Sequence, residues 1–109
     1  MSTLTKVDDG NFQDFVSQAG LVLVDYGATW CGPCKKLNPV LEEIQGERAD
    51  VRIGKVDIEE ARQAALANGV MSVPQVHFYR DGNKVDQFMG YLDKTKVLAY
   101  INKHLPAQS

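Results

Sequence analysis

The spacing of apolar residues divides the chain into alternating strands and helices. Residues 21–26 form an almost continuously apolar run, which is typical of a central strand covered by helices on both faces. A second strand is predicted over 51–58. The apolar positions of 11–18, and those of a longer segment that follows Cys34 and ends near Gly46 or Arg48, recur at helical spacing.

The rest of the chain continues this alternation. The further predicted elements are an edge strand over 3–7, an alanine-rich helix over 59–68 closed by Gly69, strands over 75–79 and 84–89 joined by an Asp-Gly turn, a last helix capped by Asp93, and a loose tail over 106–109. The order β-α-β-α-β-α-β-β-α predicts the α/β class, with helices on both faces of a mixed sheet, parallel in its first half and antiparallel in its second.

Length and charge narrow the classes of function. The chain has 109 residues, enough for a single domain over 1–109. Its 12 basic and 14 acidic residues leave no positive excess for nucleic acid. No aliphatic run approaches the ~20 residues of a membrane span, and the first residues lack the apolar stretch of a secretory signal. We therefore expect a cytoplasmic monomer that binds neither nucleic acid nor membrane.

The two cysteines, Cys31 and Cys34, are the strongest chemical signal in the chain. A disulfide that closes so short a loop stabilises the fold by only about 2 kcal/mol, so stability is a weak reason for the pair. The spacing places both thiols on one helical turn, where they can oxidise to a disulfide with little backbone movement. Pro33 suits the first turn of that helix, because it lacks an N–H that would have no acceptor.

Position assigns each sulfur a different role. Cys31 falls at the helix start, where free N–H groups, the helix dipole and the nearby Lys35 and Lys36 favour a thiolate, so we expect it to be a reachable nucleophile. Cys34 lies on the helix face shared with Leu37, which packs inward, so we expect it to be shielded. In the predicted cycle Cys31 attacks a substrate disulfide, and Cys34 resolves the mixed disulfide.

A zinc site is the alternative for the same cysteines. Tetrahedral zinc needs four ligands, and the other candidates are carboxylates and two lone histidines, His77 and His104, neither at zinc-finger spacing. We therefore expect no metal.

Asp25 is a charged residue in the apolar central strand, where an unpaired carboxylate costs several kcal/mol. The strand leads into the loop of Cys31, so Asp25 lies beneath the dithiol. Burial raises the pKa of a carboxyl, which would let Asp25 accept the Cys34 proton and return it to the leaving thiolate. Lys55 alternates with apolar neighbours on the second strand and can reach toward Asp25; the alternative is a salt bridge that merely satisfies both charges.

The six residues Trp30 to Lys35, read with the strand end before them, resemble the thioredoxin family, and the resemblance runs from about Thr5 to Leu105. It implies the thioredoxin fold, a protein-disulfide reductase without a bound cofactor, and re-reduction by thioredoxin reductase with electrons from NADPH. It also implies site residues. These are Asp25 as the buried acid, Lys55 as its neighbour, Trp30, Gly32, Pro33 and Lys35 around the dithiol, Pro39 as a helix kink, Val73 and Pro74 as the cis-proline loop, and Gly90 beside the site.

The residues of the Val73–Pro74 loop agree with this implication. Only an X–Pro bond adopts cis at modest cost, and a proline at a strand start removes one N–H. From the residues alone, an ordinary trans proline at the start of the strand is the alternative. A cis bond would bring the loop against the sulfurs and leave the Val73 backbone free to pair with an extended substrate.

Four positions depart from the family pattern. Gly27 stands where a tryptophan is usual, so a large ring beside the motif is missing. Gln75 replaces a threonine after the proline, and Lys36 and Asn38 replace apolar or small residues. We expect these changes to affect partner choice and the active-site loop more than the chemistry.

Two rival functions use the same residues. An oxidase or isomerase of this fold is one, although Gly32-Pro33 between the cysteines resembles the reducing members. A binding module with an incidental dithiol is the other. The chain has no dinucleotide fingerprint, so electrons from NADPH must arrive through another protein.

Overall fold

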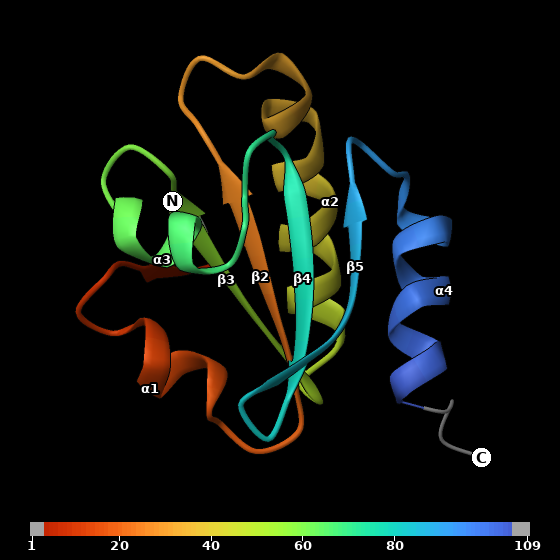
Figure 1. Ribbon diagram of the computed structural model, residues 1–109. Coiled ribbons are helices and arrows are strands. Elements are labelled where there is room, and N and C mark those ends of the chain that lie inside the picture. The colour runs from red at the N-terminus through yellow and green to blue at the C-terminus, as the bar shows by residue number, and fades with distance from the viewer. Residues whose placement is uncertain (1–3, 106–109) are drawn as a thin grey trace.

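The computed structural model describes residues 4–105. The start of the expected edge strand at Thr3 and the expected tail over 106–109 lie outside the described residues. The elements are β1 (Thr5–Val7), α1 (Phe12–Val16), β2 (Leu21–Gly27), α2 (Gly32–Glu47), β3 (Val51–Asp57), α3 (Arg62–Ala67), β4 (Gln75–Arg80), β5 (Asn83–Met89) and α4 (Lys94–His104) (Figure 1). The predicted element order is confirmed.

A five-stranded mixed sheet forms the centre of the molecule, in the order β1-β3-β2-β4-β5. β3 pairs in parallel with β1 and β2, whereas β4 pairs antiparallel with β2 and β5. β2 is therefore central, as its apolar run predicts, and six of its seven residues are buried. The predicted α/β class is confirmed.

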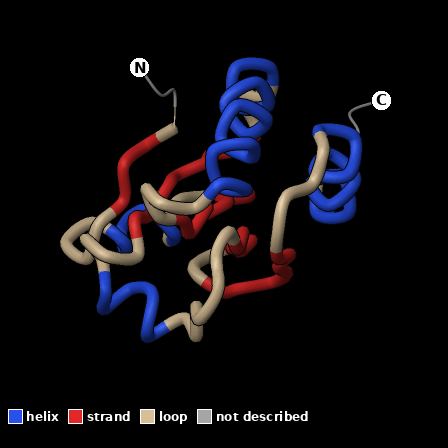
Figure 2. Tube along the Cα trace, turned by 90° about the horizontal axis from the view of Figure 1, so that it is seen from above, coloured by secondary structure: helices blue, strands red, loops and turns tan. Residues whose placement is uncertain are grey.

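Helices cover both faces of the sheet. Leu37 and Leu41 of α2 and Ile101 of α4 pack on one face, in a cluster with Leu23 and Phe78. α1 and α3 pack on the other face, in a cluster that includes Val24 and Tyr26. Figures 1 and 2 show α2 and α4 on the side of the sheet opposite to α1 and α3. None of the helices within residues 4–105 combines the length and apolar character needed to cross a membrane.

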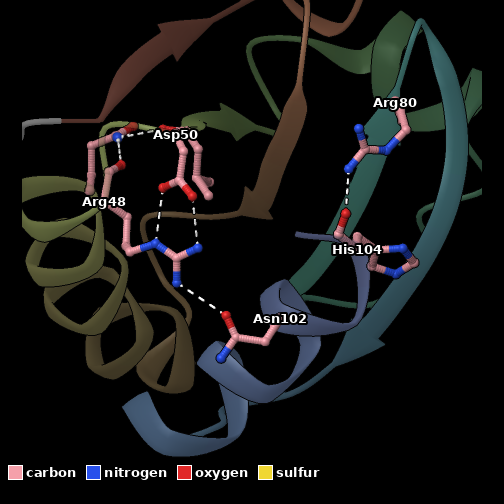
Figure 3. Close-up of polar contacts among 7 residues, drawn as sticks. Arg48, Asp50, Arg80, Asn102 and His104 are labelled. Atoms are coloured by element: carbon pink, nitrogen blue, oxygen red, sulfur yellow. Dashed lines mark hydrogen bonds and ion pairs between the residues drawn. The ribbon is translucent and has the colours of Figure 1, made fainter. Parts of the chain in front are cut away.

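Polar contacts attach α4 to the end of α2 and to the end of β4 (Figure 3). Arg48 donates two hydrogen bonds to the Asp50 carboxylate, at 2.9 and 2.8 Å, and a third to Asn102 of α4 at 3.2 Å. Arg80 at the end of β4 donates to the carbonyl oxygen of His104. These bonds hold the last helix at both the α2 end and the sheet.

The third helix is shorter than the sequence predicts: it spans Arg62–Ala67 rather than 59–68. The preceding residues form a turn instead, in which the Asp57 carboxylate accepts the Glu59 N–H at 2.8 Å. Asp9 then accepts the N–H of Ala64 at 2.8 Å, so the helix start is satisfied by a residue far away in the sequence. Local periodicity carries no signal for such a contact. The first helix is also shorter, ending at Val16.

We predict that Gly54→Ala destabilises the protein. A Cβ at this position on β3 would lie 2.6 Å from Phe15 and Val7 side-chain atoms, so the core must shift, at a cost of about 1–3 kcal/mol in the free energy of unfolding. Gly46→Ala in α2 is the matched control. Its Cβ meets nothing within 4 Å, and we expect it to stabilise the helix by about 0.5–1 kcal/mol. Urea unfolding of both variants measures the difference, and equal midpoints would contradict the packing argument.

Candidate active site

Cys31 and Cys34 form a disulfide at the start of α2, with their Cα atoms 5.3 Å apart. Cys31 is the N-cap residue of the helix, and Pro33 lies in its first turn, as the sequence predicts. The Cys31 Sγ accepts the Cys34 backbone N–H at 3.2 Å. A helix-start donor is therefore directed at the first sulfur, where it would stabilise negative charge on a thiolate.

The expected contrast in exposure between the two cysteines is absent from the disulfide form. Cys31 is 4% exposed and Cys34 is 3% exposed. Both pack with Ala28, and Val73 and Ile58 lie against the three. Helix position alone predicts the exposure of a residue on its own helix, whereas Cys31 is covered by Ala28, Ile58 and Val73 from neighbouring segments. The residues beside the pair remain open, with Trp30 66% exposed.

Asp25 is buried on β2, on the face that α2 covers. Burial raises the pKa of its carboxyl to about 7, against a smaller lowering by the positive charge of Lys55. The two residues are directly paired across β2 and β3, as expected. Of the ion pairs within residues 4–105, however, none joins them, and Asp25 Oδ1 has no hydrogen-bond partner. The alternative interpretation, a salt bridge between Asp25 and Lys55 that satisfies both charges, is therefore not supported.

A cavity of about 320 Å³ connects the carboxyl with the second sulfur. Its lining comes from the end of β2, the start of α2 and the end of β3, and includes Asp25, Gly27, Ala28, Thr29, Cys34, Lys35, Asn38, Lys55, Val56 and Asp57. A Cβ on Gly27 would lie 3.3 Å from Cys34 Sγ, closer than an ordinary contact, so the backbone of residue 27 packs directly against that sulfur. The sequence indicated a lost ring at Gly27. Thr29 and Asp57 also line the cavity, and no sequence motif indicates either of them; strand pairing places Asp57 opposite Gly27.

The loop before β4 lies against the disulfide. The Val73–Pro74 bond is cis, as expected, and Val73 packs on the cysteine cluster. Gly90, with φ +82°, donates its N–H to the Pro74 carbonyl oxygen at 2.9 Å, so it borders the same loop. The structure thus brings together the residues of three separate segments: the α2 start, the cis-proline loop and the turn after β5.

The zinc alternative has no support in the described part of the chain. The cysteines are bonded to each other, and no cluster of three or more His, Cys, Asp or Glu side chains there is placed to hold a metal ion. His77 is hydrogen-bonded to Gln75, and His104 pairs with Asp86.

Comparisons with known proteins agree with this geometry. The thioredoxin family model matches residues 3–103. A thioredoxin of Chlamydia caviae is 45% identical over 94 residues, which cover 86% of this chain and 91% of that protein. One from Staphylococcus saprophyticus is 43% identical over 103 residues, or 94% and 98% of the two chains. The crystal structure of Chlamydomonas reinhardtii thioredoxin f2 superposes with a TM-score of 0.89 at 33% identity, covering 96% of this chain and 99% of that one.

Fold, disulfide and relatives define a disulfide oxidoreductase that acts through a redox-active cysteine pair. The chain belongs to the thioredoxin family, whose members act on disulfide-containing targets.

We predict that Asp25→Asn changes how stability depends on pH. The pKa of Asp25 is about 7 in the folded state and about 3.9 in an unfolded chain, so the folded state holds a proton that the unfolded state releases between those values. The free energy of unfolding of the parent therefore falls as pH rises from about 4 to 7, by up to about 4 kcal/mol, whereas the uncharged amide loses this dependence. Urea unfolding of the oxidised forms from pH 4 to 9 measures it. A variant-minus-parent difference that stays constant with pH would contradict the assignment.

Proposed function

We propose that this protein reduces protein disulfides with Cys31 as the attacking sulfur and Cys34 as the resolving one. The Cys31 thiolate attacks one sulfur of the target disulfide, and the other target sulfur leaves as a thiolate. The Cys34 thiolate then attacks Cys31 Sγ, which releases the second target sulfur and forms the Cys31–Cys34 disulfide. Two electrons pass to the target. The observation that carries the proposal is the disulfide at the N-terminus of α2, with a backbone N–H on Cys31 Sγ.

Asp25 is proposed as the proton carrier for the second half of the cycle. Its pKa of about 7 lets it exist in both protonation states near neutrality, and its unpartnered oxygen shares a cavity with Cys34. As a carboxylate it takes the proton of the Cys34 thiol, and as a carboxylic acid it returns a proton to the leaving target thiolate. Lys55 keeps the carboxylate form accessible by its positive charge.

The target segment is proposed to lie across the cis-proline loop. The backbone of Val73 would pair with an extended target chain, while Pro74 and Gly90 shape the floor of this site. Trp30, Gly32 and Pro33 are exposed beside the disulfide and would contact the same segment, and Lys35 adds positive charge near the thiolate.

We also propose the source of the electrons, the cellular compartment and the oligomeric state. Thioredoxin reductase, using NADPH, would return the Cys31–Cys34 disulfide to the dithiol. The chain would act in the cytoplasm as a monomer, with residues 1–109 forming a single domain.

We predict that the two cysteine variants behave differently toward a disulfide-bridged protein such as insulin. Cys34→Ser retains the nucleophile and loses the resolving thiol, so a covalent one-to-one mixed disulfide through position 31 accumulates. Cys31→Ser forms no such adduct and leaves insulin reduction at the uncatalysed background. Non-reducing electrophoresis and mass spectrometry of iodoacetamide-quenched samples identify the adducts. A mixed disulfide formed as fast by Cys31→Ser would reverse the assignment of the two sulfurs.

We also predict that a thioredoxin reductase supports turnover of the parent protein. With NADPH, reductase and insulin present, NADPH oxidation rises in proportion to the concentration of this protein. Cys31→Ser is the matched control and stays at background. If the parent reduces insulin with dithiothreitol but not with the reductase, another electron donor serves it. If the parent and Cys31→Ser reduce insulin equally, the binding-module function is supported instead.

A further inference from the structure

Polar side chains occupy the interior of the sheet face that α1 and α3 cover. Gln75, His77 and Tyr79 alternate along β4, so they project from the same face as Tyr26 on the neighbouring strand. All are buried: Gln75 is 5% exposed, His77 0% and Tyr79 3%. Burying such groups without partners costs several kcal/mol, so a hydrogen-bond network must satisfy them.

The network runs along β4 in a defined order. The Tyr26 and Tyr79 hydroxyls lie 2.9 Å apart, and Tyr79 donates to Asn68 Oδ1 at 3.0 Å. His77 Nδ1 lies 3.5 Å from the same Tyr79 hydroxyl, and His77 Nε2 lies 2.9 Å from Gln75 Oε1.

The imidazole of His77 is neutral near pH 7, because burial, and to a smaller extent the positive charge of Lys84, lower its pKa to about 4. A neutral ring carries one N–H. The acceptor Oε1 requires that proton on Nε2, so His77 donates to Gln75. Nδ1 then carries no proton, and Tyr79 gives its one proton to Asn68, so the bonds that lead into the loop begin at His77.

The last members of the network lie in the cis-proline loop. With its carbonyl held by His77, the Gln75 side-chain amide is left directed at Ser72, and it donates to Ser72 Oγ at 3.4 Å. The Ser72 hydroxyl in turn donates to Met89 Sδ, 3.8 Å away at the end of β5. Ser72 is exposed and immediately precedes Val73, so a buried network ends on the surface segment that faces the disulfide.

We propose that His77 and Gln75 are positioning residues for target binding: His77 orients the Gln75 amide, and the amide holds Ser72 and with it the backbone of Val73 that an extended polypeptide target pairs with. The inference rests on the proposed function, because it concerns the same loop. It assigns a role to Gln75, whose side chain bonds to His77 at one end and to Ser72 at the other, at a position where the family resemblance leads us to expect a threonine.

Loss of the contact between Gln75 and Ser72 should change the affinity for a protein target but not the reactivity of the cysteines. Removing one neutral hydrogen bond from the loop should weaken the complex with a protein target about fivefold. Asp25 lies on the opposite face of the sheet, and the cysteines keep their packing against Val73 because the substitutions leave that side chain in place. A small disulfide such as hydroxyethyl disulfide has no extended backbone to pair with the loop, so its reduction should not change.

The experiment uses the fully reduced full-length chain in quenched flow with increasing insulin, which gives a limiting rate and a half-saturating concentration for each variant. Ser72→Ala, at an exposed position, and Gln75→Leu should each raise the half-saturating concentration about fivefold, with the limiting rate unchanged. Ser72→Thr keeps the hydroxyl and should restore the parent value. Gln75→Leu also leaves the buried His77 Nε2–H without an acceptor, so it should in addition lower stability in urea. For target binding, the combination with Ser72→Ala should be no worse than Gln75→Leu alone, because each already removes the bond between Gln75 and Ser72.

Tyr79→Phe is the matched control, since it removes a buried hydroxyl from the Asn68 end of the network and leaves the bond between His77 and Gln75. It should lower stability in urea without changing the half-saturating concentration. The proposal is overturned if Ser72→Ala binds insulin like the parent, if the effects of the two loop variants add, or if hydroxyethyl disulfide reduction falls equally. If the unmodified protein did not reduce insulin at all, the proposed function itself would be overturned instead.

Discussion

The pairing of β2 between β3 and β4 is the constraint on which the rest of this structure depends. It places Asp25 opposite Lys55 on one side and opposite Val76 on the other, deep in the sheet. The end of the same strand leads into the loop and the first turn of α2, which carry the disulfide. The position of β2 in the sheet therefore determines where the two sulfurs lie. Because β4 runs antiparallel to β2, the start of β4, and the cis-proline loop before it, lie at the same end as the loop after β2.

The two faces of the sheet bury polar groups in different ways. On the α2 side, Asp25 is buried without a hydrogen bond on Oδ1, and burial raises the pKa of its carboxyl to about 7, so that it can hold or release a proton near neutrality. On the α1 and α3 side, buried polar groups are joined into a network and serve geometry rather than proton exchange. A single strand pair, β2 with β4, contributes to both.

Much of this arrangement follows from local sequence patterns. The apolar run of β2, the helical spacing after Cys34 and the Asp-Gly turn each predict their element, and the position of Pro33 predicts a helix start at the cysteines. Periodicity could not reveal what depends on contacts between distant segments. The Asp9 carboxylate at the start of α3, the burial of Cys31 under the neighbouring loops, and the chain from His77 to Ser72 all require the folded arrangement of side chains.

The glycine at the end of β2 couples two positions that are seven residues apart. Any side chain at residue 27 begins 3.3 Å from Cys34 Sγ, so the Cys34 side chain must give way by a few tenths of an ångström to accommodate it. The resolving sulfur is thus fitted against bare backbone at residue 27, and the tolerance for a side chain there is set by how far that one sulfur can move.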